Sequence, residues 1–60
     1  MMKDELAKLI KENREALELT QAELAEKLGV SKASVANWEQ GRNKPSKTVL
    51  LLLDRLVNDR

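Results

Sequence analysis

Two short helix patterns meet at Gly29 with almost no sequence between them. Thr20 and Glu23 have the spacing of a capping box, in which each side chain accepts a backbone N–H at a helix start. Gly29 is the residue type best able to adopt the positive φ at which a helix ends. Ser31 then provides a cap for a second helix. Because so short a turn forces the two helices to cross steeply, the sequence predicts a helix-turn-helix.

Hydrophobic periodicity predicts one further helix on each side of this motif, and therefore an all-α fold. The expected helices cover about Lys3–Leu17, Gln21–Leu28, Lys32–Gln40 and Lys47–Asn58. Glycine and proline make residues 41–45 a loop. The residues that keep a helical period in the first helix are Leu6, Leu9, Ile10, Asn13 and Leu17.

The last helix carries more apolar residues than one inward face can hold. Its expected inward stripe consists of Val49, Leu52, Leu53 and Leu56. Leu50 and Val57 lie at the edge of the stripe, and Leu51 points nearly opposite its centre. Leu51 is either an ordinary surface leucine or, together with Leu50 and Val57, a contact between two copies of the chain.

The composition excludes several classes of function. The chain has no cysteine and no histidine, which excludes a disulfide framework and a thiolate or imidazole metal site. Residues 49–53 form the longest apolar run, far shorter than the roughly 20 residues that span a bilayer, and residues 1–4 lead into no apolar signal segment. We therefore expect one cytoplasmic domain over residues 1–60, without membrane contact, cofactor or enzymatic activity.

The charges are unevenly distributed although the formal net charge is only +1. Residues 1–30 carry five cations and seven carboxylates, whereas residues 31–60 carry six cations and three carboxylates. Four of the six cations lie in or near the second motif helix, at Lys32, Arg42, Lys44 and Lys47. A local positive field of this kind attracts phosphate even when the net charge is near zero.

The stretch from Thr20 to Pro45 resembles the Cro/cI-type helix-turn-helix family, also called the xenobiotic-response-element family, of phage repressors, bacterial regulators and antitoxins. The residues that carry the resemblance are Thr20-Gln21, Glu23-Leu24-Ala25, Leu28-Gly29-Val30-Ser31, Val35, Trp38-Glu39, Gly41 and Pro45. They span nearly half of the chain, and the flanking helices fit the family more loosely. The resemblance implies a compact four- to five-helix bundle of the phage-repressor type, with the motif at about residues 20–40.

The resemblance also implies a function. Members bind double-stranded DNA, so we expect a sequence-specific transcriptional regulator, in particular a repressor, with no small-molecule effector implied. An engineered or designed member of the family would also suit the regular Lys/Glu surface and the doubled initial methionine. The competing interpretation is a protein-interaction module, such as an antitoxin-like helical domain. A homodimer is compatible with either interpretation, because members of the family commonly dimerise through C-terminal elements.

The second motif helix has one face free of bulky apolar residues, opposite Val35 and Trp38. In the family, such positions meet base edges in the major groove. The resemblance therefore implies that Lys32 donates to guanine, that Asn37 pairs with adenine, and that Ala33 and Ala36 touch a thymine methyl. The alternative is a solvated helix face with an ordinary lysine.

Other polar residues are candidates for the DNA backbone. Gln21 matches a glutamine that in phage repressors contacts a phosphate and braces the recognition helix, and helix N-termini favour anions. A loop that leaves the groove must cross the sugar-phosphate ridge. The remaining phosphate candidates are Ser31, Arg42, Asn43, Lys44 and Lys47. For each cation the alternative is a contribution to surface solubility alone.

Five residues are expected to have structural roles. Gly29 ends the first motif helix, and Val35 shares the inward face with Trp38, so we expect Trp38 in the core rather than stacked on bases. Arg14 and Glu39 match a basic and an acidic position that pair in some repressors. The alternative is two independent surface charges.

Overall fold

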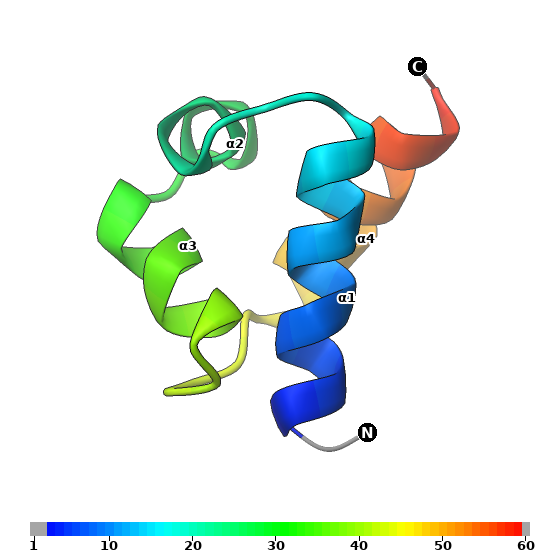
Figure 1. The fold of residues 1–60 in the computed structure, drawn as a ribbon. Coiled ribbons are helices and arrows are strands. Elements are labelled where there is room, and N and C mark those ends of the chain that lie inside the picture. The colour runs from blue at the N-terminus through cyan, green and yellow to red at the C-terminus, as the bar shows by residue number, and fades with distance from the viewer. Residues whose placement is uncertain (1–2, 60) are drawn as a thin grey trace.

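The computed structural model describes residues 3–59, which form four helices and no strand. The helices are α1 (Lys3–Ala16), α2 (Gln21–Leu28), α3 (Lys32–Glu39) and α4 (Lys47–Asn58). In Figure 1, α2 and α3 lie on one side of the molecule and α1 stands beside α4 on the other. The predicted all-α fold is confirmed, with four helices rather than five in the described residues. No helix within residues 3–59 has the length and apolar character needed to cross a membrane.

Side-chain caps set the starts of the last three helices. At α2, Thr20 Oγ1 accepts the Glu23 N–H at 3.1 Å and Glu23 Oε1 accepts the Thr20 N–H at 2.8 Å, which completes the predicted capping box. Ser31 and Ser46 each accept a backbone N–H from the first turn of α3 and α4, at 3.1 and 3.3 Å. The predicted bounds of α2 and α4 match the structure, whereas α1 and α3 each end one residue earlier than expected.

The first three helices end in the same way, with a left-handed residue just beyond the last turn. These residues are Glu18, Gly29 and Gly41, with φ of 59°, 72° and 74°. In each case the following N–H bonds back to a carbonyl five residues earlier, at 3.2, 3.0 and 2.9 Å, which is the Schellman pattern. Glycine marks two of these ends in the sequence, whereas nothing marks the end at Glu18.

The core lies where the inward faces of the four helices meet. Ile10, Leu24 and Val35 are fully buried, and Trp38 keeps only 7% of its surface exposed. The buried cluster consists of Leu6, Ile10, Leu24, Ala25, Leu28, Val35, Trp38 and Leu53. With so little of its ring accessible, Trp38 serves packing and has no free face for a base. Val30 packs against the cluster at the corner of the motif.

Leu52, which was predicted in the inward stripe, and Leu9, which keeps the helical period of α1, are both exposed. Leu52 of α4 is 38% exposed and Leu9 of α1 is 39% exposed. The inward stripe of α4 centres on Leu53, and because each residue turns the helix by about 100°, Leu52 falls outside it. Leu50 and Val57, placed at the edge of the stripe, pack against the core together with Val49 and Leu56. Leu51 is 59% exposed, as its position predicted.

Candidate nucleic-acid interface

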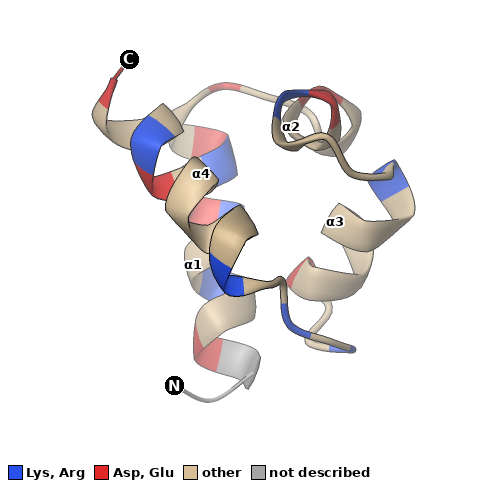
Figure 2. Ribbon diagram, turned by 180° about the vertical axis from the view of Figure 1, so that it is seen from behind, with Lys and Arg blue, Asp and Glu red and all other residues tan. Residues whose placement is uncertain are grey.

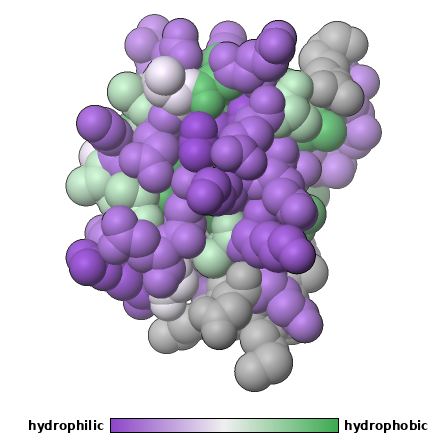
Figure 3. Space-filling view, viewed as in Figure 1, coloured by the Kyte–Doolittle hydropathy of each residue, from purple (hydrophilic) through white to green (hydrophobic). Residues whose placement is uncertain are grey.

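The turn between α2 and α3 presents the outer face of α3 to solvent. Val35 and Trp38 hold the helix against the core from one side. On the other side Lys32 and Ala33 are exposed, and Ala36 and Asn37 are half-buried. The hydrophilic surface in Figure 3 is broken only by small separated apolar areas. The structure thus brings the four predicted base-reading residues onto the accessible part of α3.

Gln40 extends this surface by one residue. It follows the last turn of α3 and is exposed. Helical angles place it on the same face as Lys32 and Ala36, although no DNA contact is predicted for it. Ser34, for which no role is predicted, lies at the start of the same helix. Its Oγ lies 3.0 Å from Ser31 Oγ, so two hydroxyls meet at the start of α3.

The predicted phosphate-binding residues lie at the start of α2, at the start of α3, in the loop that follows α3 and at the start of α4. Five of them are exposed, and they are Ser31, Arg42, Asn43, Lys44 and Lys47. The Arg42 N–H donates to the Asn37 carbonyl at 2.9 Å, which fixes where the chain leaves the last turn of α3. The hydroxyl oxygen of Ser31 accepts the hydrogen bond that caps α3. Ser31 would therefore bind an anion by donating its hydroxyl hydrogen.

The electrostatics of this side depend on one buried carboxylate. Between residues 27 and 53 the sequence has a single acidic residue, Glu39, whose side chain is only 5% exposed. Lys32, Arg42, Lys44 and Lys47 are exposed and form no ion pair with the described residues. Figure 2 shows blue at the start of α3 and along the following loop, whereas red concentrates on α1, α2 and the end of α4. The surface around α3 is therefore locally cationic.

Arg14 and Glu39 form an ion pair that joins α1 to α3. Arg14 Nε donates to Glu39 Oε2 at 2.7 Å and Arg14 Nη2 donates to Glu39 Oε1 at 3.2 Å. Arg14 Nη1 also donates to the Leu19 carbonyl at 2.9 Å, between α1 and α2. The hydrogen bond to Glu39 is the main cause that raises the pKa of Arg14, which keeps the guanidinium charged.

Gln21 completes this network from α2. Its Nε2 donates to Glu39 Oε1 at 3.2 Å, so Glu39 accepts three hydrogen bonds from two helices. The amide nitrogen carries a second hydrogen, and Gln21 is half-buried at the start of α2. One donor is thus used to brace α3 while another remains available to an external acceptor.

The three residues assigned to a dimer contact do not form one patch. Leu50 and Val57 are half-buried and line a groove between α1 and α4. Leu51 lies outside this groove, beside Leu52 and Arg55. The exposed apolar surface of α4 therefore consists of Leu51 and Leu52. Among the described side chains, no group of acidic residues has the arrangement of a metal site.

Comparison with known proteins agrees with this geometry. The helix-turn-helix family matches residues 10–58. The chain is 46% identical over 49 residues to an uncharacterized HTH-type transcriptional regulator of Methanothermobacter thermautotrophicus, which covers 82% of this chain and 67% of the regulator. It is also 46% identical over 48 residues to the type II methyltransferase M.SsoII of Shigella sonnei, which covers 75% of this chain. No solved structure matches the chain.

The two relatives differ in how much of their length is shared. The chain spans 67% of the regulator but only 13% of the methyltransferase, so the second match gives no argument for methyl transfer here. The family match covers both motif helices, α4 and part of α1. It includes Gly29 and the Glu39 network described above. The chain therefore belongs to the Cro/cI-type helix-turn-helix family.

Proposed function

We propose that this domain binds double-stranded DNA sequence-specifically, with α3 in the major groove, and acts as a transcriptional regulator, in particular a repressor. The observation that carries the proposal is the charge arrangement around α3. Its exposed cations form no ion pair with the described side chains, and the carboxylate of Glu39 in α3 itself is held by Arg14 and Gln21. A major groove about 12 Å wide admits a helix whose outer face carries small side chains.

The proposed contacts divide into two kinds. Lys32 and Asn37 read base edges, while Ala33 and Ala36 allow close approach and touch thymine methyls. The residues proposed to bind phosphate are Gln21, Ser31, Arg42, Asn43, Lys44 and Lys47. Phosphate contacts position the domain and are the same for every sequence, so only the first group specifies the operator.

The likeness to an HTH-type transcriptional regulator supports a regulatory role. A domain that occupies a promoter blocks other proteins sterically, and repression requires nothing more. The alternative of a protein-interaction module predicts no preference among DNA sequences. Selection from randomised duplex DNA at moderate salt separates the two, because specific binding enriches one motif.

Substitutions test the division of contacts. Lys32→Ala and Asn37→Ala are each expected to relax the preference at one base pair, by about 1–3 kcal/mol where the contact is bidentate. Arg42→Ala is expected to weaken binding to all sequences alike. Lys8→Ala, an exposed change on α1, is the control and should alter neither property. A selected motif that stays the same in both α3 variants would contradict the groove assignment.

A further inference from the structure

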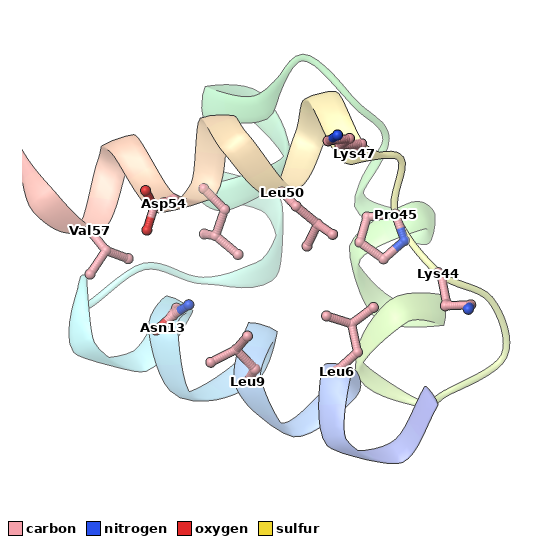
Figure 4. Close-up of a pocket in the computed structure, with 10 residues that line it drawn as sticks. Leu6, Leu9, Asn13, Lys44, Pro45, Lys47, Leu50, Asp54 and Val57 are labelled. Carbon is pink, nitrogen blue, oxygen red and sulfur yellow. The ribbon is translucent and has the colours of Figure 1, made fainter. Parts of the chain in front are cut away.

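A groove of about 740 Å³ lies between α1 and α4, apart from the predicted base-reading residues (Figure 4). Leu6 and Leu9 line it from α1, and Leu50 and Val57 line it from α4. Pro45 closes one end. Ligand pockets commonly have about 300–1,000 Å³ and mostly apolar walls with a few polar groups, and this groove has both properties. Its apolar walls include Leu9, which is 39% exposed in the described part of the chain.

The two ends of the groove differ in charge. Lys44 and Lys47 flank Pro45 at one end, and Asp54 lies toward the other end with Asn13 (Figure 4). Both lysines are exposed and have no ion-pair partner among the side chains described, those of residues 5–59. An anion is therefore attracted to the lysine end and repelled from the Asp54 end, which gives an elongated ligand one preferred orientation.

We propose that this groove binds a small amphipathic carboxylate. Its hydrocarbon chain lies along Leu9, Leu50 and Val57, and its carboxylate meets Lys44 and Lys47. Burial of the hydrocarbon chain supplies most of the affinity, because removal of apolar surface from water is the main favourable contribution to such binding. The lysines select a carboxylate over a neutral or cationic head group.

A second copy of the domain fits the groove less well. Symmetric pairing would place one concave surface against another and leave an unfilled space, whose walls lose their packing partners. Leu51 is more exposed than Leu9 and lies outside the groove, so self-association has a better contact elsewhere. A flexible chain is able to enter the groove and follow its walls.

Methyl NMR with octanoate as the probe tests the proposal directly and without DNA. Saturable shifts are expected for Leu9, Leu50 and Val57. The methyls of Leu51 and Leu52 should stay unchanged, and they report detergent-like adsorption because they are exposed outside the groove. Parallel shifts of both groups, or shifts that never saturate, would overturn the proposal.

Two leucines of equal exposure provide a matched pair of variants. Leu9 is 39% exposed inside the groove and Leu52 is 38% exposed outside it. Leu9→Gln should lose octanoate binding, whereas Leu52→Gln should bind like the parent, with circular dichroism confirming that both fold. Equal binding by the two variants would contradict the assignment. Shifts of Leu50 that depend on protein concentration without octanoate would instead assign the groove to a second copy.

The head group is tested by comparing octanoate with octanol and octylammonium. The parent should bind octanoate more tightly than the other two probes. The double variant Lys44→Gln with Lys47→Gln should have a roughly threefold to tenfold lower affinity for octanoate and an unchanged affinity for octanol. Equal affinity of the parent for all three probes would overturn the carboxylate assignment. Because these measurements contain no DNA, they stand or fall independently of the proposed function.

One consequence does rest on the proposed function. Lys44 and Lys47 are also proposed phosphate ligands, so octanoate should compete with duplex DNA for them. The expected result is a lower DNA affinity of the parent in octanoate and no change for Leu9→Gln. If the protein binds octanoate but no duplex at all, the proposed function fails while the groove assignment stands.

Discussion

Glu39 shows how one side chain serves both packing and charge. Its carboxylate is buried beside α1 and α2, and Arg14 and Gln21 together donate three hydrogen bonds to it. A buried ion pair adds little net stability compared with a well-packed apolar pair, but breaking it leaves an uncompensated charge. Its main effect here is to hold α3 against two helices at a set orientation. The ion pair also withdraws the carboxylate of Glu39 from the cationic surface around α3.

Glu18 is a non-glycine residue in a conformation that favours glycine. Its φ is 59°, and the Schellman bonds at the end of α1 require this geometry. Glu18→Gly should therefore raise the free energy of unfolding by about 0.5–1 kcal/mol, measured by urea denaturation. Glu15→Gly, three residues earlier inside α1, is the matched control and should lower it by about 1 kcal/mol. The same sign for both changes would contradict this account.

At the scale of an element, α2 should depend on pH through its capping box. The hydrogen bonds from Thr20 lower the pKa of Glu23 below its ordinary value. The unfolded chain therefore takes up this proton at a higher pH than the folded domain does. The stabilisation is fully present above the ordinary pKa of glutamate and is lost as the pH falls through the lowered pKa of the folded state.

Glu23→Gln is the variant that tests this dependence. It should reduce the free energy of unfolding near pH 7, whereas the difference from the parent should shrink as the pH falls through the lowered pKa of Glu23. Glu26→Gln controls for the loss of one negative charge from α2. A difference between Glu23→Gln and the parent that stays constant with pH would show that the carboxylate charge has no part in the cap.

The sequence predicted the elements well because their ends are set by local chemistry. Thr20, Ser31 and Ser46 cap the helices that follow them, and each signal lies within four residues of the bond it makes. The orientation of α4 was predicted less well. Leu52 was assigned inward because periodicity gives the width of an apolar stripe, whereas its centre depends on where α1 and α2 lie.

The candidate site shows the same limit. The free face of α3 follows from helical angles, since Val35 and Trp38 mark the opposite side. Arg14 and Glu39 are 25 residues apart, so only the family resemblance suggested the pair. The bond from Gln21 to Glu39 was expected only as a general brace. Side-chain contacts between distant segments need the tertiary arrangement, and the α1–α4 groove leaves no signal in the sequence for that reason.

At the scale of the whole molecule, one copy offers little surface to DNA. The proposal gives one recognition helix and about four cations per domain, so the slope of log K against log salt should be roughly −3 to −4 for one copy. Two copies on a palindrome should give about twice that slope. A symmetric pair also requires half-sites about 10 base pairs apart, one turn of the duplex.

We propose that Leu51 makes the contact between two such copies, because it is 59% exposed and lies beside exposed Leu52 on α4. Leu51→Glu should weaken binding to a palindrome and leave binding to an isolated half-site unchanged, since a charge at a symmetric contact faces its own copy. Lys11→Glu, an exposed change on α1, controls for the added negative charge. If the parent and Leu51→Glu each bind the palindrome and the isolated half-site with equal affinity, the domain binds DNA as a monomer. If Leu51 does make the contact, Leu51→Glu should bind the palindrome without cooperativity. Its salt slope on the palindrome should then fall to the value measured on the half-site.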